Sequence, residues 1–255
     1  MTIAIDSSPA APAALSTPPP LRELAGLSLF LDFDGTLVEI AERPDLVVVA
    51  PELPEALALL ADRLDGRLAM VSGRSLAMLD HLLGPLGIAM AGSHGGEFRP
   101  AGAVAAMALA APFPDAANTA MKAFAQDKPG LVFEAKPFSA AVHYRGNPAL
   151  GATLWLFAQD IAARFGLKAK HGKMVVELAT PGSDKGNALD RFMALPPFVG
   201  TRPIFVGDDV TDEDGFAAVG AFGGAGVLVG AMRETRAIWR LESVAAVHRW
   251  LEDSA

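Results

Sequence analysis

The sequence predicts an α/β protein in which a small α+β unit is inserted into a core built on a parallel sheet. Two observations lead to this prediction. Near both ends of the chain, short apolar runs that end in polar residues are separated by amphipathic stretches, which is typical of buried parallel strands and their crossover helices. In the middle of the chain the pattern changes to a helix followed by two strands, and this order occurs twice.

The parallel sheet is predicted from three apolar runs, each followed by a polar cluster. The predicted strands are Leu27–Leu31, Leu68–Val71 and Ile204–Val206. The periodic stretches predicted as helices are Pro51–Leu64, Ser75–Leu83 and Lys185–Leu195. Because ligands of open parallel sheets bind outside the carboxyl ends of the strands, we expect the three polar clusters to meet at one site.

The inserted unit is predicted to span residues 98–179, between two core segments, 21–97 and 180–255. Its predicted helices are Pro114–Gln126 and Asn147–Phe165. Its predicted strands are Leu131–Lys136, Ala140–Arg145, Leu167–Lys170 and Lys173–Leu178, the last two turning at His171-Gly172. The two halves show no close sequence repeat, so the pattern does not establish a duplication.

Composition argues against several classes of protein. With 255 residues, of which 51% are hydrophobic, the chain can build a sizeable core. Its net charge of −8 makes it a poor binder of nucleic acid or membrane surfaces, although local cations can still hold a small anion. The lack of cysteine excludes disulfides and thiol catalysis and fits a cytoplasmic location. The sequence leaves the oligomeric state open and is compatible with a monomer.

Two segments need an interpretation of their own. Residues 1–20 are rich in Ala, Pro, Ser and Thr and lack the basic and apolar regions of a signal peptide, so we predict a disordered leader. The apolar run Gly215–Met232 approaches the length of a membrane helix, but it is rich in glycine and alanine, and Gly223-Gly224 interrupts it. We therefore predict a helix, a turn and a buried strand there, and no membrane span.

The polar cluster Asp32-Phe33-Asp34-Gly35-Thr36 follows the first predicted strand. Two carboxylates at this spacing repel each other unless a cation compensates them, and oxygen ligands suit Mg²⁺. Gly35 lets the backbone turn sharply and bring N–H groups close to a phosphate. The alternative is a helix cap or an Asx turn, since Asp-Gly is a common turn dipeptide.

A second acidic cluster, Gly207-Asp208-Asp209-Val210-Thr211-Asp212-Glu213, follows the strand at Ile204–Val206. Its alternative interpretation is a solvated helix start whose acidic residues face the helix dipole. Four carboxylates in six positions exceed what capping requires. If the strands before the two acidic clusters are neighbours, Asp208 completes a metal site that begins with Asp32.

Two further clusters offer groups for a phosphate. Ser72-Gly73-Arg74 supplies a hydroxyl and backbone N–H groups after the second strand, and Lys185 follows Ser183-Asp184 and can neutralise a carboxylate–phosphate pair. The structural alternatives are a serine helix cap and a capping segment followed by a surface lysine. Each cluster alone is a weak signal.

Together these motifs resemble the haloacid dehalogenase superfamily of phosphohydrolases, in which an Asp-x-Asp-Gly-Thr loop, a Ser or Thr at a strand end, a Lys and an acidic loop occur in this order. The resemblance narrows to the trehalose-6-phosphate phosphatases, whose acidic loop has the Gly-Asp-Asp-x-Thr-Asp-Glu form of residues 207–213. Further matches are Ser72-Gly73-Arg74, His94-Gly95, Glu134-Ala135-Lys136, His143-Tyr144-Arg145 and Gly172-Lys173-Met174-Val175-Val176-Glu177. The similarity runs from about Leu29 to Leu251.

The resemblance implies a Rossmannoid core with an inserted cap domain, and Mg²⁺-dependent hydrolysis of trehalose 6-phosphate, the last step of trehalose biosynthesis. It implies that Asp32 is the nucleophile, which forms an aspartyl phosphate, and that Asp34 is the general acid and base. The implied metal ligands are Asp32, Asp34 and Asp208, in an acidic loop supported by Asp209 and Asp212. The implied phosphate-binding residues are Gly35, Ser72, Gly73, Arg74 and Lys185.

The inserted unit is expected to select the sugar. Alternate residues of a strand share a face, so Glu134 and Lys136 point the same way, as do His143 and Arg145. Charged side chains suit the many hydroxyls of a disaccharide. The resemblance implies that the substrate-binding residues are Glu134, Lys136, Glu177, His94 and Arg145. The alternative is cross-strand ion pairing on a solvated sheet face.

Other functions are compatible with these residues. A related phosphatase could act on sucrose phosphate or mannosyl-3-phosphoglycerate. A phosphosugar-binding module without turnover is another class of protein, but binding alone does not require the acid Asp34. A mutase would use the same nucleophile and would need an activating bisphosphate.

Overall fold

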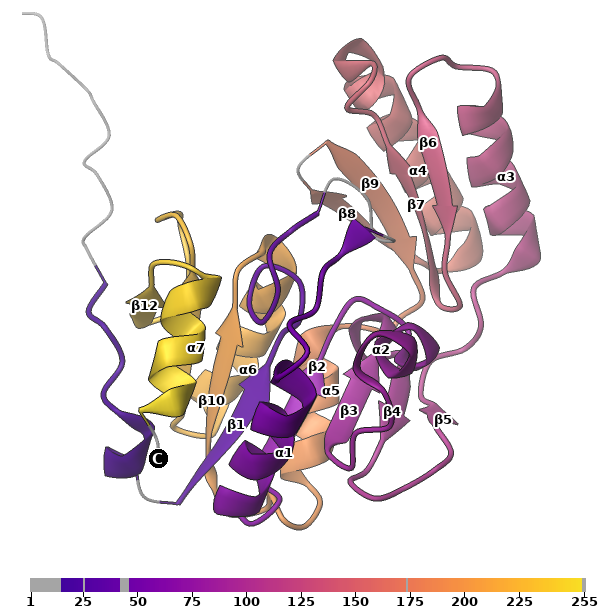
Figure 1. Ribbon diagram of the computed structural model, residues 1–255. Coiled ribbons are helices and arrows are strands. Elements are labelled where there is room, and N and C mark those ends of the chain that lie inside the picture. The colour runs from indigo at the N-terminus through magenta and orange to yellow at the C-terminus, as the bar shows by residue number, and fades with distance from the viewer. Residues whose placement is uncertain (1–14, 25, 42–45, 173, 254–255) are drawn as a thin grey trace, which may run out of the picture.

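The computed structural model describes residues 15–24, 26–41, 46–172 and 174–253. Two sheets organise these residues, one of eight strands in the order β12-β11-β10-β1-β2-β3-β4-β5 and one of four in the order β6-β7-β9-β8. Figure 1 shows the smaller sheet and its two helices beyond the end of the larger sheet toward which β1 points. The predicted fold class, a largely parallel α/β core with a separate α+β unit, is confirmed.

In the larger sheet, the six strands from β12 to β3 run parallel, and β4 and β5 continue it antiparallel. The bounds are β1 Leu27–Leu31, β2 Leu68–Val71, β3 Ala89–Gly92, β4 Glu97–Arg99, β5 Met107–Ala108, β10 Arg202–Gly207, β11 Ala225–Val229 and β12 Trp239–Leu241. The chain starts the sheet at its centre with β1, which lies between β10 and β2. The loops after these central strands therefore open at the crevice where ligands of such sheets bind.

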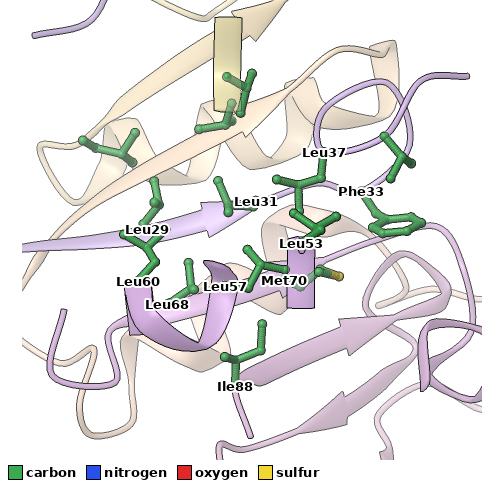
Figure 2. Close-up of a cluster of buried hydrophobic side chains, with 14 of the residues drawn as sticks. Leu29, Leu31, Phe33, Leu37, Leu53, Leu57, Leu60, Leu68, Met70 and Ile88 are labelled. Atoms are coloured by element: carbon green, nitrogen blue, oxygen red, sulfur yellow. The ribbon is translucent and has the colours of Figure 1, made fainter. Parts of the chain in front are cut away.

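Helices cover both faces of the larger sheet. One face carries α1 (Leu53–Arg63), α2 (Leu76–Leu83) and α7 (Val244–Glu252), and the other carries α5 (Lys185–Met193) and α6 (Glu213–Ala221). Strand β1 serves both cores, because Leu29 and Leu31 point into the first and Phe30 into the second. Figure 2 shows Leu57 and Leu60 of α1 packed against the leucines of β1 and β2.

The smaller sheet has helices on one face only. Its strands are β6 (Val132–Ala135), β7 (Ser139–His143), β8 (Lys168–Gly172) and β9 (Val175–Ala179). Helices α3 (Asp115–Gln126) and α4 (Gly151–Phe165) form a third core with the apolar residues of β7 and β9. The alternate residues of these strands, including Glu134, Ser139 and Glu177, lie on the opposite face, which has no helix of its own and meets the larger sheet's loops.

Three predicted boundaries differ from the structure. The predicted insert 98–179 begins inside β4, and both β4 and β5 pair into the larger sheet, so the smaller unit is built from α3 onward. His171 and Gly172 belong to the β8–β9 ladder, because Gly172 pairs with Val175, and the turn follows them. The helix predicted from Asn147 starts as an α-helix at Gly151, because residues 148–150 form a separate 3-10 turn.

Residues 1–14 of the predicted leader lie outside the described residues. The rest of that segment contradicts the prediction of disorder, because it is hydrogen-bonded to the core. Ser16 pairs with Trp239 of β12, and the Trp250 indole donates a hydrogen bond to the Pro19 carbonyl oxygen. The apolar run Gly215–Met232 forms α6 and β11, as predicted. Among the described residues, no helix combines the length and apolar character that crossing a membrane requires.

Candidate active site

Three acidic side chains from distant parts of the chain meet at the carboxyl edge of the larger sheet. Asp32 follows β1 and Asp208 follows β10, and these strands are paired neighbours. The Asp32 backbone N–H donates to the Val206 carbonyl oxygen at 2.9 Å, which holds the two loops side by side. Carboxylate oxygens of Asp32, Asp208 and Asp212 all lie within 4.8 Å of one another. The two acidic clusters therefore meet, as predicted.

Lys185 is the cation among these carboxylates. Its Nζ lies 2.7 Å from Asp32 Oδ1 and 2.6 Å from Asp212 Oδ1. The position follows from local structure, because Asp184 caps α5 by accepting a hydrogen bond from the Asn187 N–H, and Lys185 is the first helical residue. Lys185 is only 2% exposed, which rules out the alternative of a surface lysine.

The charges at this edge do not balance. Burial raises the pKa of Asp32 well above its usual range, and burial together with Asp212 and Asp209 raises the pKa of Asp208 to about 7. The pKa of Lys185 rises in spite of its burial, because Asp212 and Asp32 stabilise the ammonium ion. Three carboxylates that share one ammonium group form a site that favours a further cation.

Only glycine fits at position 35. Its φ of +76° lies in the left-handed region, and a Cβ there would be 2.2 Å from Asp208 Oδ2. The turn closes through a hydrogen bond from the Gly35 N–H to the Val38 carbonyl oxygen at 2.8 Å. The glycine therefore allows the two acidic loops to approach each other.

The structure distinguishes the two aspartates that were expected to support the acidic loop. Asp209 is exposed and caps the short helix that follows, accepting from the Val210 N–H at 2.7 Å. Asp212 is fully buried, and its Oδ2 accepts from the Asp209 N–H at 2.8 Å while Oδ1 faces Lys185. The sequence signal for Asp212 was its place in the acidic motif, which did not reveal that it joins Asp32 and Asp208.

Asp34 faces a different partner from the other carboxylates. Arg74 grips it with two hydrogen bonds, from Nε to Oδ2 and from Nη2 to Oδ1, both 2.7 Å long. The Arg74 backbone N–H also donates to Ser72 Oγ at 3.1 Å. Ser75 caps α2, so the buried Ser72 is not the helix cap that its alternative interpretation required. Arg74, predicted to bind phosphate, is thus engaged by the predicted acid and base.

Glu177 joins the smaller sheet to this site. Its Oε1 accepts hydrogen bonds from Ser139 Oγ at 2.7 Å and Lys136 Nζ at 3.3 Å. Its Oε2 lies 3.9 Å from Nε2 of His94, a residue at the edge of the larger sheet. Burial acts to raise the pKa of Glu177, but Lys136 and the Ser139 hydrogen bond hold it below its usual range, so the carboxylate is ionised. Ser139 is a member of this group that the sequence did not single out.

His94 fills the space between the two sheets. A Cβ at Gly73 would be 2.6 Å from the imidazole, so only glycine leaves room for the ring. Burial lowers the pKa of His94 to about 3, which keeps the ring neutral beside the ionised Glu177. Gly73 thus positions His94 in the structure, a contact that the predicted phosphate-binding role did not include.

The remaining predicted sugar-binding residues divide into two groups. Glu134 Oε2 lies 3.0 Å from His143 Nε2, and its Oε1 lies 3.9 Å from Lys136 Nζ, on the face that Glu177 shares. Arg145 lies outside these strands, because β7 ends at His143 and Arg145 is exposed in the following turn.

Comparison with solved structures defines the class of fold. A haloacid dehalogenase-like hydrolase from Bacteroides thetaiotaomicron matches with a TM-score of 0.60 and 16% identity, over 88% of this chain and 98% of that chain. The C-terminal domain of C. albicans trehalose-6-phosphate phosphatase matches with a TM-score of 0.80 and 22% identity, over 94% and 98% of the two chains. The fold is that of the haloacid dehalogenase-like hydrolases.

Sequence comparison identifies the family within this class. The model of the trehalose-phosphatase family matches residues 30–245. The trehalose-6-phosphate phosphatase of Escherichia coli (strain K12) is 41% identical over 242 residues, which cover 91% of this chain and 90% of that protein. A probable trehalose-phosphate phosphatase of Sinorhizobium fredii is 40% identical over 220 residues, 85% and 81% of the two. The chain belongs to the trehalose-phosphatase family, and is a phosphoric monoester hydrolase.

Proposed function

We propose that this protein hydrolyses trehalose 6-phosphate to trehalose and phosphate. The main observation behind this proposal is the contact between the smaller sheet and the edge of the larger sheet. Glu177, on the polar face of the smaller sheet, lies 3.9 Å from His94, whose ring packs on Gly73 of the Ser72-Gly73-Arg74 loop. Groups suited to sugar hydroxyls therefore lie next to the Ser72-Gly73-Arg74 loop, whose arginine binds Asp34. We further propose that the smaller unit is a cap that selects the sugar, and that the enzyme acts in the cytoplasm.

A magnesium ion fits the residues at the carboxyl edge. Asp32, Asp208 and Asp212 offer hard oxygen ligands, the donors that Mg²⁺ prefers, and their charge exceeds what Lys185 compensates. We propose that Asp32 and Asp208 hold the ion, with Asp212 beside them. When bound, the ion neutralises carboxylate and phosphate charge. The Asp34 carboxylate is bound by Arg74 and is not part of this cluster, so we propose that Asp34 serves as a ligand through its backbone carbonyl oxygen.

The proposed chemistry has two steps. A carboxylate oxygen of Asp32 attacks phosphorus, and the bond from phosphorus to the sugar oxygen breaks. Asp34, which takes up a proton from solvent and gives up one of its two hydrogen bonds from Arg74, passes that proton to the departing oxygen. In the second step Asp34 takes a proton from water, the water oxygen attacks phosphorus, and Asp32 leaves as a carboxylate. Lys185, Ser72 and the backbone N–H groups after Asp32 hold the phosphoryl oxygens, while Arg74 keeps Asp34 oriented.

Phosphate release from a panel of sugar phosphates tests the proposed substrate. We expect fast release from trehalose 6-phosphate, slow release from glucose 6-phosphate and sucrose 6-phosphate, and a drop to roughly 1% or less when a chelator removes Mg²⁺. Readdition of Mg²⁺ should restore the rate. Preference for another sugar phosphate would move the assignment to a related phosphatase, and binding without release would support a non-catalytic module.

Replacement of Glu177 by alanine should harm sugar recognition more than phosphoryl chemistry. A hydrogen bond to a charged group is worth about 1.5–3 kcal/mol, so kcat/KM for trehalose 6-phosphate should fall about 10- to 100-fold. For p-nitrophenyl phosphate, which has no sugar, the change should stay within about 3-fold. Steady-state kinetics on both substrates measures this difference, and Asp127→Ala at the end of α3 is the control. Equal losses on both substrates would contradict the role.

A further inference from the structure

Arg233 lies between β11 and β12 and reaches back to the acidic loop after β10. Its guanidinium donates to the carbonyl oxygens of Asp208, at 3.4 Å from Nε, and Asp209, at 2.7 Å from Nη2. Nη1 also donates to the carboxylate of Glu213, the first residue of α6. One side chain thus bonds to three residues of the loop that carries Asp208 and Asp212.

Glu213 completes this connection from the other side. While Oε1 accepts from Arg233, Oε2 accepts from the backbone N–H of Arg236 at 2.8 Å. The side chains of Arg233 and Glu213 are only 23% and 21% exposed, so water screens their ion pair less than a pair on the open surface. The segment after β11 is therefore tied to the acidic loop twice, by the side chain of Arg233 and by the side chain of Glu213.

This connection opposes the repulsion within the acidic cluster. Asp208 is the least buried of the three clustered carboxylates, and it lies in a loop rather than in a helix or strand. Repulsion from Asp212 and Asp209 opposes this position of the charged Asp208 side chain. Arg233 fixes the successive backbone carbonyls of Asp208 and Asp209, while the Asp208 side chain lies against Gly35.

We propose that Arg233 and Glu213 form a clamp that holds Asp208 in place for the metal ion before the ion binds. Arg233 is a positioning residue in this inference, since it touches neither the carboxylates of the cluster nor the reacting atoms. The inference rests on the proposed magnesium site and adds residues that lie outside it. A preorganised loop binds metal more tightly because less of the binding free energy is spent on ordering it.

The test measures metal affinity in the absence of substrate. We expect Arg233→Gln to weaken Mg²⁺ binding, titrated by calorimetry into the chelator-treated full-length protein, about 10- to 100-fold. At saturating Mg²⁺, kcat should stay within about 3-fold of the wild-type value, because the chemical groups are intact. The Arg233→Lys protein keeps the positive charge but loses the planar guanidinium with its several donors, so its Mg²⁺ affinity should lie between those of the wild type and Arg233→Gln. Arg236→Gln is the matched control, because Arg236 contributes its backbone N–H to Glu213.

Glu213→Gln provides an independent arm of the test. If the two residues act as one clamp, the double variant should lose little more affinity than either single variant. Wild-type Mg²⁺ affinity in a folded Arg233→Gln or Arg233→Lys protein would overturn the clamp while leaving the proposed function intact. Absence of Mg²⁺ binding by the wild-type protein would instead overturn the metal site, and the clamp with it.

Discussion

Replacement of Asp32 by asparagine should abolish phosphate release, with kcat lowered on the order of 10⁴-fold or more. The amide cannot form the acyl phosphate, and two nearby carboxylates, those of Asp212 and Asp34, are held by other partners. Asp212 is turned toward Lys185 and the Asp209 N–H, and Asp34 is bound by Arg74. The small rate that remains in the Asp32→Asn protein should come from direct attack by water, assisted by the remaining groups of the site. Phosphate release under saturating trehalose 6-phosphate measures it.

The Asp32→Asn protein should stay folded and should still bind substrate. Burial raises the pKa of Asp32, which means that the charged carboxylate destabilises the native state. A neutral amide of the same shape removes that destabilisation. Lys185 keeps Asp212 as its partner. Thermal unfolding and substrate titration check both points, with the exposed Asp160→Asn as the control. If the Asp32→Asn protein releases phosphate at a rate within about 10-fold of the wild-type rate, Asp32 is not the nucleophile.

Replacement of Lys185 by methionine should damage both stability and activity. The ammonium group is the counter-charge of Asp32 and Asp212, which are 4% and 0% exposed. Removal of one partner from a buried ion pair costs about 3–5 kcal/mol of unfolding free energy. Loss of a group that stabilises the transferred phosphoryl oxygens should lower kcat about 10²- to 10³-fold. Chemical denaturation in the presence of a chelator measures the loss of stability.

Added Mg²⁺ separates the electrostatic cause of this loss from a packing defect. A cation bound among the carboxylates should restore part of the stability of Lys185→Met, because it replaces the missing positive charge and binds only the folded state. Lys122→Met, at an exposed position of α3, should leave stability unchanged. A Lys185→Met protein as stable as wild type in chelator would contradict the account of an unbalanced buried cluster.

The longer strands of the larger sheet could be predicted because their burial is visible in the sequence. Leu27–Leu31 and Leu68–Val71 are continuous apolar runs, and the structure places β1 and β2 at those bounds with every residue buried. β4 and β5 gave no such signal, because they contain three and two residues and β5 is exposed. Strands this short depend on hydrogen bonds to a neighbour that is already in place, which local pattern does not encode.

The leader shows the same limit. The composition of residues 1–20 predicts disorder, but Ser16 and Pro19 find partners on β12 and α7, more than 200 residues away. Polar backbone groups pair with whatever the fold places beside them. Composition indicates how little apolar surface a segment can bury by itself. It does not indicate that the fold provides an edge strand, here β12, with which the segment can pair.

The sequence by itself determined the order of the motifs, the chemistry of their side chains and the buried strands before them. From these follow the class of fold and the meeting of Asp32 with Asp208, because parallel neighbours bring their carboxyl ends together. Only the tertiary structure decided how the charged groups pair. Arg74 binds Asp34, Lys185 lies between Asp32 and Asp212, and Arg233 holds the acidic loop. The physical reason is that an ion pair depends on distance and burial in three dimensions, which residue type and spacing along the chain do not fix.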